Sequence, residues 1–383
     1  MFLEMTTRKN RALIEAAKTL HQSGAILPDT YVLDLDTILE NAKSLKKQAD
    51  KSGIELFYMT KQIGRNPLVA KKIHEIGITN AVVVDFKEAE IMMKHHLPIG
   101  NIGHLVQIPY HMIEKVVNYN PKFITVYSLE MIKRIEEVAK KNNKKQKLLV
   151  KIIEPEDEIY AGQYGGFHLN ELHALGKLSQ KLTNVEIAGL TSFPCFLLEG
   201  ESFQLTHNVE TMKQAKQILE SYDLKINDLN MPSATCVNTI PIIKELGGTH
   251  GEPGHALTGT TPLHATKDLV ETPAMVYVSE VSHNLDGKAY FYGGGYYPRG
   301  HLKNALINQG GELIHDEVEP FNSENIDYYL QTKKEHPVGS TVIAAFRTQI
   351  FVTRSDVAVV SGIQKGQLKV EGIFDSSGNL IRR

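Results

Sequence analysis

A lysine that directly follows a strand-like run is the first residue of this chain whose surroundings suggest chemistry. Lys61 stands in "ELFYMTKQIGRNP" (residues 55–67), behind a short apolar run rich in aromatic residues. Such runs, bounded by turn residues, are typical of buried strands. The lysine is then either a surface side chain whose stem covers apolar surface, or a nucleophilic amine at the mouth of a pocket. Its neighbours in the fold decide between the two.

Two later segments offer groups that bind anions. "MPSATC" (231–236) places the hydroxyls of Ser233 and Thr235 in a turn after a strand-like run. "GGTHGEPGHALTGTTP" (247–262) is a glycine-rich loop whose backbone amides could hold a phosphate. Most glycine-rich loops are only tight turns. The loop therefore gains weight only if it shares a rim with the lysine.

The elements that must position these groups alternate between strand-like and helical patterns from residue 28 onward. The strand-like segments are 31–36, 55–60, 80–85, 101–107, 123–127, 147–153, 184–193, 229–234 and 250–257. This alternation indicates a parallel sheet, and about eight repeats fit a closed (β/α)₈ barrel over residues 28–264 better than an open sheet. Lys61, after the second segment, then lies on the catalytic face with the two later segments.

The ends of the chain follow other patterns, and the composition excludes several classes of protein. Residues 1–27 predict a helical extension, and residues 265–383 read as short strands separated by turns, which predicts a separate all-β domain. The net charge of −2 gives no case for nucleic acid or anionic membrane. No apolar run reaches the ~20 residues that span a bilayer, and no signal peptide is evident. With only Cys195 and Cys236, we expect a cytoplasmic protein without disulfides or a metal site.

Together these segments resemble the fold-type III pyridoxal 5′-phosphate (PLP) enzymes, the superfamily of alanine racemase and of ornithine and diaminopimelate decarboxylases. "YMTKQIGRNP" is similar to the family's lysine segment, which implies that Lys61 is the Schiff-base lysine. "PSA" matches the phosphate-binding serine turn at Ser233. "EPGHALTG" matches the segment whose glycine amide contacts the phosphate, here Gly254 with the amide of His255. The resemblance therefore implies PLP as the cofactor.

Glu252 and the β domain imply different activities. In this family the residue before Pro-Gly faces the pyridine nitrogen, and it is an arginine in alanine racemases but a glutamate in the decarboxylases. "YFYGGGYYPRGH" (290–301) instead resembles the racemase motif whose tyrosine enters the partner subunit's site, which makes Tyr292 or Tyr296 the second acid/base group and implies a homodimer. The decarboxylases bring a cysteine from this domain, and both cysteines here lie in the barrel region. For the same reason the metal-dependent aldolases and dehydratases of the family are a poor match.

Further departures from the family imply a substrate other than alanine. Phe193 occupies the place of the histidine that stacks on the cofactor ring, and Tyr164 stands near that of an arginine at the phenolic oxygen. Arg65 replaces a phosphate-binding tyrosine and could bind the phosphate as a cation. Arg347 and Arg354 are candidates for binding the substrate carboxylate.

We therefore expect a PLP-dependent amino-acid racemase or epimerase that acts by two-base α-proton transfer on a small-molecule amino acid. Lys61 moves the proton on one face and Tyr292 or Tyr296 moves it on the other. The alternatives are a PLP-dependent decarboxylase, a non-catalytic PLP-binding protein, and a metabolite-binding barrel without PLP. The sequence does not identify the amino acid.

Overall fold

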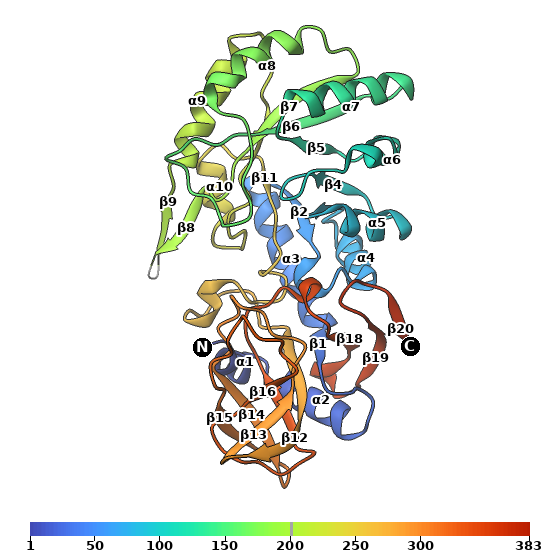
Figure 1. The fold of residues 1–383 in the computed structure, drawn as a ribbon, viewed down its shortest axis with the longest axis vertical. Coiled ribbons are helices and arrows are strands. Elements are labelled where there is room, and N and C mark those ends of the chain that lie inside the picture. Colours follow the sequence, from blue (N-terminus) through green and yellow to red (C-terminus); the bar gives the residue numbers. More distant parts are fainter. Residues whose placement is uncertain (200–201) are drawn as a thin grey trace. The chain divides into compact units, whose positions relative to one another are not determined.

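The computed structural model describes residues 1–199 and 202–383, which form two compact units (Figure 1). The barrel unit comprises residues 45–60 and 70–254. The β unit comprises residues 1–44, 61–69 and 255–383. Each unit is therefore assembled from segments that are distant in the sequence.

The barrel unit contains a closed barrel of eight parallel strands in the order β10-β11-β2-β3-β4-β5-β6-β7. Its strands are β2 (Glu55–Met59), β3 (Asn80–Val83), β4 (Ile99–Ile102), β5 (Phe123–Val126), β6 (Gln146–Lys151), β7 (Val185–Thr191), β10 (Asp228–Asn230) and β11 (His250–Gly251). Most of their residues are buried, because a parallel barrel is covered on both faces. The predicted (β/α)₈ barrel is thus confirmed, as is the all-β region that follows it.

Helices alternate with these strands and cover the outside of the barrel (Figure 1). They are α3 (Leu35–Ser52), α4 (Pro67–Ile76), α5 (Phe86–Lys94), α6 (Ile113–Tyr119), α7 (Leu129–Lys141), α8 (Leu172–Ser179), α9 (Asn208–Glu220) and α10 (Ile240–Glu245), and a short hairpin, β8 (Phe196–Glu199) and β9 (Ser202–Leu205), precedes α9. Helix α7 shows why they form: Ser128 caps its first turn, and its buried Ile132, Ile135 and Val138 recur on one face. Among the described residues, no helix is both long and apolar enough to cross a membrane.

The β unit is built on a ten-stranded sheet in the order β15-β14-β17-β12-β1-β18-β19-β20, with β13 paired to β12 and β16. Its strands are β1 (Thr30–Asp34), β12 (Met275–Leu285), β13 (Lys288–Tyr292), β14 (Asn304–Gln309), β15 (Glu312–Glu317), β16 (Tyr329–Gln331), β17 (Thr341–Ala344), β18 (Asp356–Ser361), β19 (Lys369–Phe374) and β20 (Leu380–Arg382). Helices α1 (Phe2–Lys9) and α2 (Arg11–Gln22) belong to the same unit.

The first strand corrects one prediction. Strand β1, within the segment 31–36 that we expected to open the barrel, pairs with β12 and β18 of the β unit instead. A buried apolar strand followed by a helix has the same local pattern in either sheet, since pairing is decided by contacts hundreds of residues away. The barrel strands therefore run from Glu55 to Gly251 within the expected range 28–264, and Lys61 follows the first of them rather than the second.

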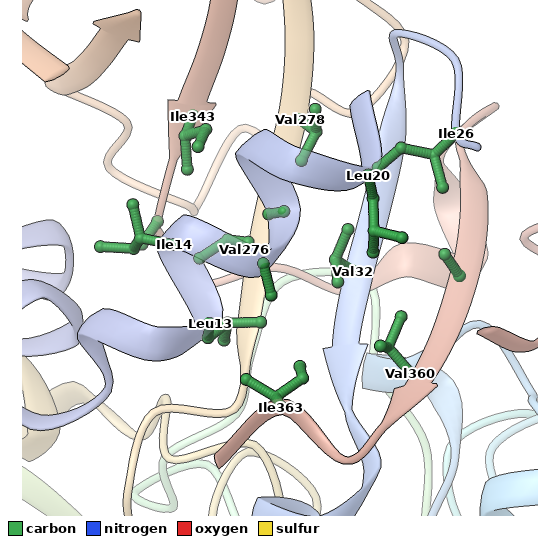
Figure 2. Packing of buried hydrophobic residues seen from close by; sticks show 14 of the residues in the cluster. Leu13, Ile14, Leu20, Ile26, Val32, Val276, Val278, Ile343, Val360 and Ile363 are labelled. Atoms are coloured by element: carbon green, nitrogen blue, oxygen red, sulfur yellow. The ribbon is translucent and has the colours of Figure 1, made fainter. Parts of the chain in front are cut away.

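The core of the β unit lies between helix α2 and the sheet (Figure 2). Leu13, Ile14 and Leu20 of the helix lie over Val32, Val276, Val278, Ile343 and Val360 of the strands. Each of these buried side chains contributes up to about 1.5–3 kcal/mol of transfer free energy. The N-terminal helical segment is therefore an integral part of the packing in this unit.

Candidate functional site

A buried carboxylate occupies the end of strand β11 in the barrel unit. Glu252 follows Gly251 directly, and its Oε1 accepts a hydrogen bond from Asn230 Nδ2 at 2.8 Å and a longer one from Asn101 Nδ2 at 3.4 Å. His104 Nε2 lies 4.0 Å from Oε2. Amide donors of this kind hydrogen-bond the carboxylate oxygen and fix its direction. The sequence predicted Glu252 but not these partners, although Asn101, His104 and Asn230 are polar residues in or beside barrel strands.

The two hydroxyl side chains in the turn after β10, Ser233 and Thr235, have different hydrogen-bond partners. Ser233 Oγ accepts the backbone N–H groups of Cys195, at 2.5 Å, and Phe196, at 3.4 Å. Its own proton finds no acceptor among the described residues, so it can be donated to a ligand. Thr235 Oγ1 donates to the Pro232 carbonyl at 2.9 Å and accepts the N–H of Glu252 at 2.9 Å. Thr235 therefore fixes the Glu252 backbone, and of the two hydroxyls Ser233 is the donor that remains.

Aromatic side chains gather beside this carboxylate in the barrel unit. The Phe193 ring lies 5.9 Å from the His104 ring, edge to face, and 5.3 Å from the Tyr160 ring. Because His104 also approaches Glu252, Phe193 belongs to the same end of the barrel as the carboxylate. Tyr164 is 70% exposed, so the structure does not bring it into this group.

In the β unit, a histidine contacts an arginine and is influenced by the charge of a lysine. Lys61 begins a single 3-10 turn (Lys61–Ile63), and His255 is the first residue of this unit after Gly254, the last residue of the barrel unit. Arg347 Nε donates to His255 Nε2 at 3.1 Å, and His255 Nδ1 lies 3.1 Å from Thr260 Oγ1. Burial, and then the charges of Arg347 and Lys61, hold the pKa of His255 well below its usual value.

The neutral histidine has a consequence for these cations. Since Nε2 accepts from Arg347, the hydrogen-bond pattern assigns the ring proton to Nδ1, which donates to Thr260. The imidazole therefore orients the guanidinium without neutralising it. Arg347 also lines a cavity of about 240 Å³ whose other polar lining residues include His301 and Lys303. An arginine and a lysine therefore line the same cavity of the β unit.

Arg65 is held tightly by its own unit. Its guanidinium lies over the Phe351 ring, 5.0 Å from the centroid, and its backbone has a φ of +54°. A Cβ added to Gly378 would lie 2.4 Å from the Arg65 carbonyl oxygen. Only 6% of this arginine is exposed. Buried arginines are normally held for the planar recognition of anions or for stacking, and Arg65 stacks.

The two candidate tyrosines differ in their surroundings. Tyr296 donates a long hydrogen bond to the Phe321 carbonyl at 3.5 Å, and its ring lies 4.6 Å from the Phe321 ring. Tyr292, at the end of β13, is 37% exposed and contacts the Tyr329 ring at 5.8 Å. Its hydroxyl has no hydrogen-bond partner among residues 1–199 and 202–383. Of the pair, Tyr292 is the one whose hydroxyl is available to another molecule.

Arg354 and the potential metal ligands have other placements. Arg354 pairs with Asp327 at 2.7 Å, and Asp327 in turn accepts the N–H groups of Gly294 and Tyr296. The arginine therefore braces the glycine loop after β13. Within the described part of the chain, no three His, Cys, Asp or Glu side chains gather as metal ligands.

Comparison with known proteins places this chain in a family. Residues 33–262 match the family "Alanine racemase, N-terminal domain", and residues 276–370 match "YhfX-like, C-terminal domain". The chain therefore belongs to the alanine racemase N-terminal domain family. It is 43% identical, over 385 residues and the full length of both chains, to a protein of Escherichia coli (strain K12) named "Uncharacterized protein YhfX".

Solved structures with the same fold cover several activities. An alanine racemase of Clostridium difficile 630 in complex with cycloserine is 18% identical, with a TM-score of 0.66 over 91% of this chain and 99% of that one. A D-threonine aldolase from Filomicrobium marinum is 14% identical, with a TM-score of 0.65 over 91% and 95%. A lysine decarboxylase from Selenomonas ruminantium is 15% identical, with a TM-score of 0.62 over 87% and 90%. At these identities the likeness shows the fold, and the activity has to be argued from this chain's own residues.

Proposed function

We propose that this protein is a PLP-dependent amino-acid racemase or epimerase. The observation that carries the proposal is Lys61, which comes two residues after the first strand of a barrel that belongs to the alanine racemase family. In a (β/α)₈ barrel, residues that follow the strands form the catalytic face. The proposal makes Lys61 the residue that carries the cofactor and then moves the substrate's α-proton.

The residues present fit this cofactor. Ser233 has a hydroxyl proton to donate, as a phosphate group requires, and the arginine at Arg65 supplies a buried cation. Glu252 is a buried carboxylate oriented by two asparagines, as a protonated pyridine nitrogen requires. PLP, when bound, withdraws electrons from the substrate α-carbon. Gly254 and the amide of His255 remain our proposed phosphate contacts, and Phe193 our proposed ring contact.

A second acid/base group on the opposite face completes a racemase. We assign it to Tyr292 rather than Tyr296, because Tyr296 is engaged within its own chain and the Tyr292 hydroxyl is available. A tyrosine exposed in this way would act in the site of a partner subunit, so the proposal includes a homodimer. With one group on each face, a proton removed from one face of the α-carbon can be replaced on the other, which inverts the configuration.

The second candidate function is an amino-acid decarboxylase, and Glu252 favours it. A carboxylate at this place is the decarboxylase-type residue of the family. Both functions use Lys61 and Glu252, and they differ in whether the α-proton or the α-carboxylate leaves. The distinction is therefore experimental.

The test is product analysis of the PLP-loaded protein with a panel of amino acids in deuterium oxide. A racemase incorporates α-deuterium and yields both enantiomers, as measured by mass spectrometry and chiral chromatography. Release of carbon dioxide with formation of the amine would replace racemase by decarboxylase. If no amino acid exchanges its α-proton or loses carbon dioxide while PLP is fully bound, the protein is not an enzyme of either kind.

A further inference from the structure

A second lysine, which the proposed function does not use, is buried in the barrel unit. Lys151 is the last residue of β6 and pairs in register with Thr191, the last residue of β7. Only 3% of it is exposed, and among the described residues it is the one lysine that is buried. The fold therefore removes an ammonium group from water at the carboxyl end of the strands, where ligands of such barrels bind.

The amine has a fixed position but no counter-charge. Lys151 Nζ donates to the Gln163 carbonyl at 2.9 Å and lies 3.4 Å from the Tyr127 hydroxyl, with the Tyr127 ring centroid at 4.7 Å. Across residues 1–199 and 202–383, no carboxylate lies within 4.0 Å of it. Burial alone lowers the pKa of Lys151 to about 8, because nothing charged nearby offsets the desolvation. Burial also raises the pKa of Tyr127, so this phenol is neutral and supplies no negative charge.

The surrounding chain holds the lysine rigidly. The Lys151 carbonyl accepts the N–H of Phe167 at 2.8 Å, so the segment that follows β6 folds back onto the strand. The Tyr127 hydroxyl donates its proton to the His104 carbonyl, which leaves its oxygen to accept from Lys151. Two of the three ammonium hydrogens therefore have protein acceptors. The third has none among the described residues.

Lys151 belongs to the same polar cluster as the proposed cofactor carboxylate. Tyr127 links Lys151 to the His104 backbone, and the His104 ring lies 4.0 Å from Glu252. No arginine of the barrel unit could take the place of Lys151 in this cluster. Its single arginine, Arg134, is on the outer helix α7 and pairs with Glu137 at 3.0 Å. An anion that enters this end of the barrel unit would find Lys151 as the buried cation.

We propose that Lys151 is an oxyanion-binding residue at the mouth of the barrel, and that its ligand is a singly charged oxygen: the substrate's α-carboxylate or the phenolic oxygen of the cofactor. This assignment rests on the proposed function for the identity of the ligand, but not for the binding itself. An anion supplies the counter-charge that the fold withholds, and it accepts the remaining ammonium hydrogen. Lys151 would thereby fix the orientation of the bound molecule.

The experiment measures anion binding without turnover. Propionate has a carboxylate but no amine, so it cannot react, and propionamide is its neutral control. We expect calorimetric titration of the PLP-loaded protein to give propionate binding that weakens up to tenfold per pH unit above about pH 8, and no binding of propionamide. Lys151→Met should bind propionate at least tenfold more weakly. Lys151→Arg should bind it with no loss up to pH 9.5, because arginine stays charged.

A second measurement separates the two sources of the oxyanion. If Lys151 binds the phenolic oxygen of the cofactor, Lys151→Met leaves the affinity for propionate unchanged. The same variant then shifts the midpoint of the pH titration that is measured by the visible absorption band of bound PLP. Unchanged propionate affinity together with an unchanged pH titration of that band would overturn the proposal. Thermal unfolding guards against misfolding, since removal of an uncompensated buried charge should leave the Met variant at least as stable at pH 7. Propionate binding is also measured with Lys61→Ala protein, which lacks the proposed acid/base lysine. The binding test therefore does not depend on the proposed racemase activity.

Discussion

Replacement of Asp29 by asparagine should make the β unit more stable at neutral pH. Asp29 precedes β1, and its carboxylate accepts hydrogen bonds from the hydroxyls of Ser355 and Tyr277. The glycine loop after β13 packs closely against it, because a Cβ added to Gly294 would lie 1.9 Å from Asp29 Oδ2. Burial is the largest cause that raises the pKa of Asp29, from 3.8 to about 6, and the charge of Asp327 adds to it.

The sign and size of the effect follow from this pKa. A carboxyl whose folded pKa is raised favours folding while it is protonated, below about pH 4, and this contribution is lost as the pH rises through about 6. A shift of about two units corresponds to about 3 kcal/mol, and partial exposure of the side chain reduces the expected value to about 1–3 kcal/mol. Asparagine keeps an acceptor oxygen and tolerates the left-handed backbone, where Asp29 has a φ of +62°. The variant should therefore gain this free energy at pH 8 and nothing at pH 4.

The assay is urea unfolding of the wild type and Asp29→Asn at several pH values between 4 and 8. Asp286→Asn is the matched control, since Asp286 also has a left-handed backbone, with a φ of +52°, but lies exposed in a turn. The control should follow the wild type throughout. If Asp29→Asn has the same pH dependence as the wild type, or is less stable at pH 8, burial does not govern this carboxyl and the reasoning is wrong.

Three further predictions concern the proposed site. Lys61→Ala should abolish covalent retention of PLP after borohydride reduction, and peptide mapping that finds the label on another lysine would exclude Lys61. Glu252→Gln should keep PLP bound but slow turnover about 10- to 100-fold, because a neutral amide no longer holds the ring proton; unchanged turnover at full occupancy would place Glu252 away from the ring. Tyr292→Phe should reduce racemisation about 100-fold or more and Tyr296→Phe only slightly, as measured by chiral chromatography. The reverse order would show that hydroxyl availability in one chain does not identify the acid/base group.

The barrel could be predicted from the sequence because its signal is local. Each βα repeat shows an apolar run followed by an amphipathic segment, so the number of repeats and the face that carries Lys61 follow from the pattern. Strand β1 could not be assigned to a sheet, since an apolar strand such as Tyr31 and Val32 form would be buried in either sheet, and the pairing with Tyr277 and Val276 decides. The pattern identifies a strand, and long-range pairing decides its sheet.

The sequence could single out candidate site residues where a residue follows a strand within a recognisable segment, as Glu252 and Ser233 do, and their roles in a site remain predictions. The sequence did not single out Asn101, His104 or Lys151, because these residues stand in apolar stretches with no motif around them. Thr235 shows that a residue type alone does not fix the partner of a side chain. From the sequence we expected its hydroxyl to contact a ligand, and in the structure this hydroxyl accepts the backbone N–H of Glu252. Polar residues at the ends of several barrel strands are the signal that would have found the rest.

The balance between racemase and decarboxylase depends on what can reach the substrate, more than on Glu252. A carboxylate that keeps the pyridine nitrogen protonated strengthens the electron sink for either bond that breaks, so Glu252, although it is the decarboxylase-type residue of the family, is compatible with racemisation as well. A cysteine acid would favour the decarboxylase, but both cysteines lie in the barrel unit, and burial raises the pKa of the Cys195 thiol well above its usual value. The β unit offers instead an exposed tyrosine, Tyr292, whose hydroxyl has no hydrogen-bond partner among the described residues. In the proposed homodimer, the group on the second face of the substrate would therefore be one that transfers protons, which is the reason to put racemisation first.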